Sequence, residues 1–370
     1  MEDYMSRKLL SYTAIGLILG STAIADVPKV AVDIAPVHSL VSRVMEGVGS
    51  PKLIIPAGAS PHEYSLRPSE AKSLQDADMV IWMGEDLAPW MENSIETLSK
   101  NAEVITLLEE SSTKLLDFRE GALFEEHDHG EHDDHDDHDD HDEHDHDKDH
   151  DDHEDHDDHD DHDHDKDHDD HEDHDDHDDH DHDKDHDDHD DHEDHDGHAH
   201  GEHDPHAWLS TENAQTWLNL VAGKLSAADP ENAGVYFANA AAAREEINDL
   251  VKEVNSILEP VRGRNFVVFH DAYQYFETSF DFPAAGAISL SDATDPSAAR
   301  IAEIQDRVKD EGINCVLSEP QFNANLVETV TSGTDAKTGV IDPLGLGLEP
   351  GPKLYGNLIR NMGKALAGCL

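Results

Sequence analysis

The sequence predicts an α/β protein of two lobes, each with a central, mostly parallel sheet, joined by one long helix. Short apolar, strand-like runs alternate with helix-like runs in both halves of the chain, which is typical of parallel sheets with helices on both faces. A helix-like run, Glu231–Leu258, separates the two series. A tract without large apolar residues interrupts the first series and leaves about 290 residues to fold, the size of two modest lobes.

The first lobe is expected to span residues 26–228. Its strands and helices alternate along the chain until the tract begins after Phe124. We expect strands at Lys29–Ile34, Lys52–Ile55, Asp78–Gly84 and Glu103–Leu108, and helices at His38–Val48, Leu87–Lys100 and Thr211–Ala227. The linking helix follows within residues 229–260, where Pro260 and Gly263 end it. A helix of this length spans about 40 Å.

The second lobe, residues 261–370, repeats the alternation. We expect strands at Phe266–Phe269, Ala285–Leu290, Ile313–Leu317 and Gly339–Ile341, and helices at Ser297–Asp310, Asn323–Ser332 and Leu354–Ala367. In open α/β sheets, ligands bind beyond the carboxyl ends of the strands. A ligand site is therefore expected in the cleft between the lobes.

The interrupting tract runs from His127 to His203. It holds 27 His, 43 acidic residues and 3 Lys in 77 positions, and 18 residues from His144 recur from His162. Such a segment buries too little surface to offset the entropy of ordering it, so we expect a disordered, low-complexity insertion rather than a solenoid. The tract carries −40 of the formal net charge of −61, which argues against nucleic acid or anionic lipid partners and favours cations.

Histidine pairs within the tract are candidate auxiliary metal sites. They recur with the repeat, at His144 and His146, His162 and His164, and His180 and His182. Because a flexible chain must be ordered to bring such imidazoles onto one ion, each site is expected to be weak. An acidic solubilising tail in which histidine is incidental is the alternative.

The N-terminus predicts export. Arg7 and Lys8 precede the apolar run Leu9–Ala23, and Ala23, Ile24 and Ala25 form a small-x-small cleavage pattern. Residues 1–25 are therefore expected to be a signal peptide, with a retained membrane helix as the alternative. Export makes a disulfide between Cys315 and Cys369 plausible. Closing that loop of roughly 54 residues would stabilise the fold by about 4 kcal/mol, and two free thiols are the alternative.

Four histidines lie outside the tract, and three of them have ligand-like settings. His62 and His270 follow predicted strands in polar contexts, and His206 directly precedes a predicted helix. Three neutral imidazoles and one open position make a common zinc site. The fourth histidine, His38, lies at a helix start and is harder to place.

The fourth ligand position is open between Asp342 and water. Asp342 follows the last predicted strand, at the crevice edge expected for His270. A turn residue ahead of Pro343 is its ordinary alternative role. Glu63, which neighbours His62, is a weaker candidate.

Several segments resemble one family. These are GASPHEYSLRPS, DPHAWLS, VVFHDAYQYF, LSEPQF and IDPLG. The chain resembles the zinc-specific periplasmic binding proteins of bacterial ABC importers, the ZnuA family of cluster A-I, over almost all of the mature chain outside the tract. The resemblance implies that His62, His206 and His270 bind Zn²⁺ and that His270 favours zinc over manganese. It also implies a disulfide between Cys315 and Cys369. Pro61 stands where some members carry a glutamate, which leaves water or Asp342 as the fourth ligand.

The resemblance implies a function in uptake. The expected protein is a periplasmic, monomeric solute-binding protein that captures Zn²⁺ and delivers it to the membrane permease of an ABC importer, with no nucleic acid partner. The tract would then be an auxiliary arm that collects or senses zinc. A metalloenzyme is the main alternative, since three-His zinc can activate water, but the sequence lacks HExxH. A zinc buffer or surface adhesin without a permease is the third possible function.

Overall fold

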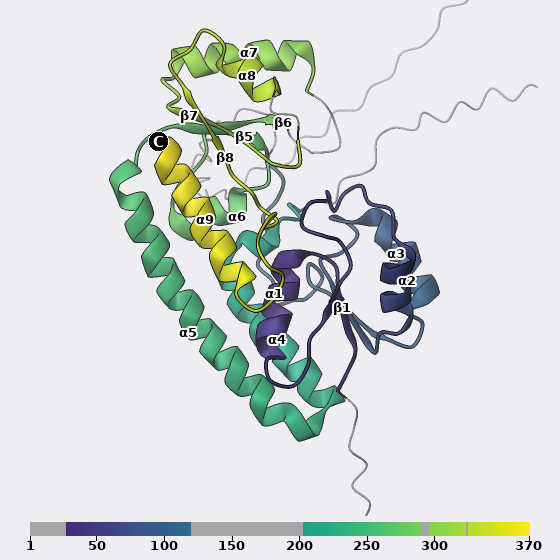
Figure 1. Cartoon of the computed structure of the whole chain (residues 1–370). Coiled ribbons are helices and arrows are strands. Elements are labelled where there is room, and N and C mark those ends of the chain that lie inside the picture. The colour runs from purple at the N-terminus through teal and green to yellow at the C-terminus, as the bar shows by residue number, and fades with distance from the viewer. Residues whose placement is uncertain (1–26, 120–202, 290–295, 323–324) are drawn as a thin grey trace, which may run out of the picture. The chain divides into compact units, whose positions relative to one another are not determined.

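The computed structural model describes residues 27–119, 203–289, 296–322 and 325–370. These residues belong to one compact unit and contain two α/β lobes, each with a parallel four-stranded sheet (Figure 1). The predicted fold class is confirmed. The predicted signal peptide and the tract up to residue 202 lie outside the described residues.

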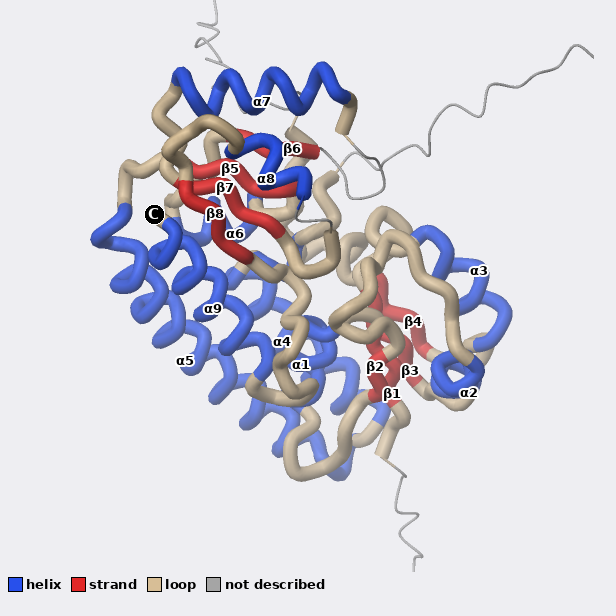
Figure 2. The backbone as a smooth tube through the Cα atoms, turned by 45° about the horizontal axis from the view of Figure 1, so that its top comes forward, coloured by secondary structure: helices blue, strands red, loops and turns tan. Residues whose placement is uncertain are grey.

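The first sheet has the strand order β2-β1-β3-β4. Its strands are parallel and comprise β1 (Val30–Val32), β2 (Lys52–Leu53), β3 (Met79–Trp82) and β4 (Glu103–Thr106). The central strands β1 and β3 are buried along their whole length, as expected for a parallel sheet covered on both faces. Figure 2 shows the sheet between two groups of helices. They are α2 (Pro68–Gln75) and α3 (Pro89–Leu98) on one side, and α1 (Ala35–Val44) and α4 (Thr211–Ala228) on the other.

The long helix is α5, Ala233–Leu258, close to the predicted range. It packs against α4, α1 and the C-terminal helix α9 (Leu354–Cys369). The buried side chains of α5 recur at helical spacing, from Tyr236 through Ala240, Ala243 and Ile247 to Leu258. Because α9 belongs to the second half of the chain and α1 to the first, α5 lies against elements from both halves.

The second sheet has the strand order β6-β5-β7-β8. Its strands are β5 (Phe266–His270), β6 (Gly286–Ser289), β7 (Cys315–Ser318) and β8 (Lys337–Val340), all parallel. Figure 2 shows the sheet between α7 (Ala298–Asp310) and α8 (Asn325–Thr331) on one side and α6 (Gln274–Phe280) and α9 on the other. Successive residues of β5 accordingly enter two different clusters: Val267 packs with Ile304 of α7, and Phe266 with the main core.

The predicted disulfide between Cys315 and Cys369 is confirmed. It joins β7 to the last residue of α9, with 5.7 Å between the two Cα atoms. A hydrogen bond from the Tyr355 N–H to the Ser39 Oγ, 2.9 Å long, links the start of α9 to α1. The C-terminal helix is thus held to both lobes.

Two helices were not predicted from the sequence. Helix α2 buries only Leu74, so it has no apolar periodicity to detect. Helix α6 has seven residues and follows so closely on β5 that its aromatic side chains continue the apolar pattern of the strand. None of the helices in the described residues is long and apolar enough to cross a membrane.

Candidate metal centre

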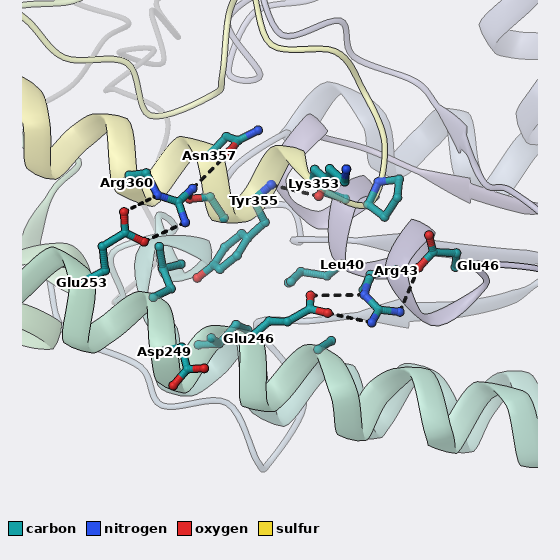
Figure 3. A pocket seen from close by; sticks show the side chains of 16 residues that line it. Leu40, Arg43, Glu46, Glu246, Asp249, Glu253, Lys353, Tyr355, Asn357 and Arg360 are labelled. Carbon is teal, nitrogen blue, oxygen red and sulfur yellow. Dashed lines mark hydrogen bonds and ion pairs between the residues drawn. The ribbon is translucent and has the colours of Figure 1, made fainter.

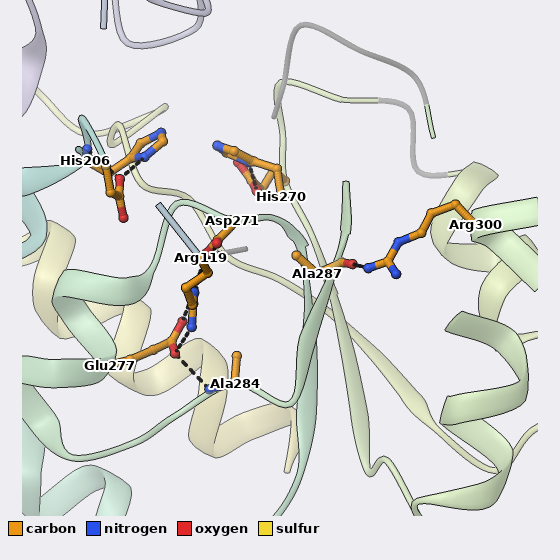
Figure 4. A network of polar contacts seen from close by, with 10 residues as sticks. Arg119, His206, His270, Asp271, Glu277, Ala284, Ala287 and Arg300 are labelled. Atoms are coloured by element: carbon orange, nitrogen blue, oxygen red, sulfur yellow. Dashed lines mark hydrogen bonds and ion pairs between the residues drawn. The ribbon is translucent and has the colours of Figure 1, made fainter. Parts of the chain in front are cut away.

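Three histidines from distant parts of the chain line one small cavity. His62 lies in the loop between β2 and α2, His206 directly precedes the short 3-10 helix Ala207–Leu209, and His270 ends β5. The ring centres of His62 and His206 are 5.6 Å apart, and those of His206 and His270 are 5.3 Å apart. Figure 4 shows the rings of His206 and His270 facing each other.

These ring separations agree with a shared zinc ion. Two imidazoles bound to one tetrahedral zinc, with Zn–N bonds of about 2.0–2.1 Å, have ring centres about 5.2 Å apart. No three His, Cys, Asp or Glu side chains among the described residues already hold their donor atoms in a metal-binding arrangement. The spacing therefore fits the metal, and the rings must still turn to converge on it.

The orientation of His270 is set by Glu319, the residue after β7. The Nδ1 of His270 lies 2.6 Å from the Glu319 Oε1, and both side chains are almost fully buried. A carboxylate accepts a hydrogen bond from a protonated Nδ1, which leaves the lone pair on Nε2. This contact therefore presents Nε2 of His270 as a metal donor.

His206 is oriented in the same way by Asp204. The Asp204 Oδ1 lies 2.7 Å from the His206 Nδ1 and accepts the His206 backbone N–H at 2.9 Å. Burial raises the pKa of the Asp204 carboxyl to about 7, although the His206 N–H and the Arg119 guanidinium act in the opposite direction. A second buried carboxylate–histidine pair thus presents a second Nε2 to the cavity.

His62 is more exposed than the other two histidines. Its side chain is half-buried, and its backbone N–H donates to the Ser60 Oγ at 3.3 Å. The loop is tied to α3 by a 2.8 Å hydrogen bond from the Trp90 indole N–H to the Pro61 carbonyl. His62 therefore presents its imidazole from a loop, whereas His270 presents its imidazole from the end of a strand.

The cavity is small enough to define its occupant. Its volume is about 20 Å³, and a volume of about 10–15 Å³ suffices for one water. Besides the three histidines it is lined by Ser60, Pro61, Trp208, Glu319, Gln321, Phe322, Pro343 and Leu344. A single ion with one water fits this space.

A larger cavity of about 560 Å³ lies between α1, α5 and α9 (Figure 3). Its charged side chains are mostly paired with one another. Arg43 binds Glu246, and Arg360 binds Glu253 through two hydrogen bonds. These pairs join the helices and offer no histidine, so this cavity lacks the chemistry of a zinc site.

The other candidate residues lie outside the small cavity. The Oδ1 of Asp342 accepts the backbone N–H groups of Leu344 and Gly345, at 3.0 and 3.1 Å, as a turn-forming aspartate does. Glu63 is exposed. His38 is buried on α1, where its Nε2 lies 3.3 Å from the Pro51 carbonyl oxygen. Neither Asp342, Glu63 nor His38 lines the cavity. The six tract histidines predicted as weak sites lie outside the described residues.

A buried ion cluster lies next to His270 and joins Arg119 of the first lobe to the second lobe (Figure 4). The Arg119 guanidinium donates to both Asp271 and Glu277, and Asp271 directly follows His270. Nearby, the Tyr275 hydroxyl donates to the Asp204 carbonyl at 2.9 Å. The segments that carry His206 and His270 are therefore cross-linked around the cavity.

The chain matches the model of the family described as "Zinc-uptake complex component A periplasmic", over residues 30–369. It belongs to this family. It is 44% identical over 351 residues to the "High-affinity zinc uptake system protein ZnuA" of Brucella abortus (strain 2308), covering 95% of this chain and 94% of the relative. It is 45% identical over 356 residues to the protein of the same name from Paracoccus denitrificans (strain Pd 1222), covering 95% of each.

Solved structures with low sequence identity share the fold. "Crystal structure of ZnuA" superposes with a TM-score of 0.63 at 17% sequence identity, covering 93% of this chain and 99% of that one. A structure titled "Structure of the SBP FpvC from pseudomonas aeruginosa in complex with Mn2+" gives 0.64 at 18% identity, with 93% and 98% covered. At these sequence identities the structural similarity supports only the shared two-lobed fold.

Three residues of the cavity's surroundings were not assigned a role from the sequence. Glu319 and Asp204 orient two histidines, and Gln321 lines the cavity. A signal existed for Glu319 and Gln321, because both follow a predicted strand at its carboxyl end. Asp204 could have been found from its spacing, two residues before His206, which suits a side chain that accepts the N–H two residues on.

Proposed function

We propose that this protein captures one Zn²⁺ in the periplasm between His62, His206 and His270 and delivers it to the membrane permease of an ABC importer. The observation that carries the proposal is the pair of buried carboxylate–histidine contacts, Glu319 with His270 and Asp204 with His206. Each presents an Nε2 toward the same cavity at a ring spacing that suits tetrahedral zinc.

Zinc suits this donor set better than harder cations. Three imidazoles are borderline ligands that suit zinc, whereas manganese and magnesium prefer carboxylate, carbonyl and water oxygens. The names of the relatives, which are zinc uptake proteins, support the same choice. The cavity holds about one water beside the rings, so we propose that the centre binds cargo and catalyses no reaction.

We propose an auxiliary role for the His127–His203 tract. Its many imidazoles and carboxylates would bind several zinc ions weakly and raise the local supply of metal near the tight site. Two roles stay open, namely chaperoning zinc to the cavity and sensing high zinc to slow transport. Uptake kinetics of a tract-deletion strain in scarce and in excess zinc would separate the two, because a chaperone matters in scarcity and a sensor in excess.

The binding proposal is tested by zinc titration of the chain lacking residues 128–202. We expect one tight site. His270→Ala should weaken zinc binding there by more than about 100-fold, which is the largest loss expected when only a hydrogen-bond partner of a ligand is removed. The matched control is His203→Ala, because His203 is a half-exposed histidine that pairs with Asp117 and lies outside the cavity. Equal effects of the two substitutions, or several tight sites in the deletion protein, would contradict the proposal.

A further inference from the structure

Gln321 is the one cavity-lining residue whose side chain has a buried oxygen without a hydrogen-bond partner in the described residues. Its Nε2 donates to the Asp342 Oδ1 at 3.2 Å, but its Oε1 is buried and accepts nothing. A buried acceptor left unsatisfied costs about 1–3 kcal/mol. A donor that arrives with the ligand would remove this cost.

The other end of the Gln321 amide acts on Asp342. The Asp342 Oδ1 receives three donors, namely the N–H groups of Leu344 and Gly345 and the Nε2 of Gln321. These three donors fix the Asp342 side chain, which lies outside the cavity, in its turn. Gln321 therefore helps to hold this carboxylate oxygen in its turn, and its side chain also lines the cavity.

The remaining wall of the cavity is largely apolar. Pro61, Trp208, Phe322, Pro343 and Leu344 contribute apolar surface to the wall. The Glu319 Oε1 is already engaged by the His270 Nδ1. A zinc ion with three protein ligands keeps a water in its fourth position, and zinc makes that water a stronger donor by lowering its pKa.

We propose that the Gln321 Oε1 accepts a hydrogen bond from a water that completes the zinc shell, while the Gln321 Nε2 keeps Asp342 out of that shell. Gln321 is then a specificity-determining residue, because three imidazoles and a water favour zinc, whereas an added carboxylate makes the site more suitable for manganese. This inference rests on the proposed zinc site and names its fourth ligand as water.

The test uses Gln321→Met, which keeps the size of the side chain and removes both amide groups. Zinc affinity of the tract-deleted protein should fall about 10- to 100-fold, as on loss of an outer-shell partner, and the preference for zinc over Mn²⁺ should narrow. The melting temperature without metal should not fall, because an apolar group replaces an unsatisfied oxygen. If Gln321 only supported the fold, Gln321→Met would lower both the zinc affinity and the melting temperature.

Gln321→Glu is the second variant, because it keeps an acceptor oxygen and adds a charge that zinc attracts. It should bind zinc at least as tightly as the unsubstituted chain. The matched control is Gln305→Met, since the Gln305 amide donates to the Thr329 and Ser332 carbonyls and lies outside the cavity. This control should leave zinc affinity unchanged.

Visible absorption of the Co²⁺-loaded protein reports the ligand shell directly. Gln321→Met should change the spectrum, and Gln305→Met should not. Unchanged zinc affinity and an unchanged Co²⁺ spectrum in Gln321→Met would overturn the role of Gln321, as would a Gln321→Glu protein as weak as Gln321→Met. These outcomes differ from failure of the zinc site itself, in which His270→Ala would leave the affinity of the tract-deleted protein unchanged.

Discussion

The two lobes have sheets with the same strand order, but an acidic residue at the end of a strand has a different role in each lobe. In the first lobe, Asp33 follows β1, and its two carboxylate oxygens accept the backbone N–H groups of Ile34 and Met83, both at 2.7 Å. In the second lobe, Glu319 follows β7 and its carboxylate orients His270. An acidic residue at the end of a central strand therefore stabilises the backbone in the first lobe and orients a metal ligand in the second.

The difference extends to how the ligands are held. The second lobe supplies His270 from the end of a buried strand, and that residue is 4% exposed. The first lobe supplies His206, which the buried Asp204 orients, and His62, which comes from a half-buried loop that the Trp90 indole ties to α3. We infer that His206 and His270, each held by a buried carboxylate, form the preformed part of the site and that the His62 loop adjusts to the metal.

The largest expected effect separates the two strand-end acids. Glu319→Ala should weaken zinc binding about 10- to 100-fold, because a ligating histidine loses the partner that fixes its tautomer and ring orientation. Asp33→Asn should leave zinc affinity close to that of the unsubstituted chain, since Asp33 does not reach the cavity. Competition titration against a zinc chelator measures both. Similar losses in the two variants would remove the distinction between the lobes.

The next effect concerns stability rather than binding. Replacing Cys315 and Cys369 by alanine should lower the free energy of unfolding by about 4 kcal/mol, because the open chain regains the entropy of a loop of roughly 54 residues. Denaturant unfolding of both forms measures this difference. Zinc affinity should change little, because neither cysteine lines the cavity. A loss of binding without a loss of stability would mean that the disulfide serves the site.

The third effect is a pH dependence of stability that belongs to the first lobe. Burial raises the pKa of Asp33 to about 7, against the two N–H bonds that lower it. The folded state therefore keeps a proton that the unfolded chain releases near pH 4, and stability falls as pH rises from about 4 to 7. The slope from this group is at most about 1.4 kcal/mol per pH unit. In Asp33→Asn, this contribution to the pH dependence should be absent when the free energy of unfolding is measured from about pH 4 to pH 7.

The smallest effect tests the His62 loop. Trp90→Phe removes the indole N–H that holds the Pro61 carbonyl and keeps most of the aromatic surface. A single hydrogen bond of this kind contributes about 1 kcal/mol, so zinc affinity should fall by less than about tenfold. A loss as large as that of Glu319→Ala would show that the loop is as preformed as the strand end.

Much of the fold could be predicted from the sequence because apolar runs and helical spacing record local structure. The strands and the long helix α5 lie close to their expected places, and the segments that contain His62, His206 and His270 carried a family resemblance. Helix α2 could not be predicted, since it buries a single leucine. The pairings of Glu319 with His270 and Gln321 with Asp342 join residues 49 and 21 positions apart, so only the folded chain reveals them.

The central claim is that His62, His206 and His270 bind one zinc ion through their Nε2 atoms. A crystal structure of the chain lacking residues 128–202 with one equivalent of zinc, with the metal located by its anomalous scattering, tests this most directly. We expect a single zinc within about 2.0–2.1 Å of each of the three Nε2 atoms. Zinc bound elsewhere, or bound without one of these three histidines, would contradict the account.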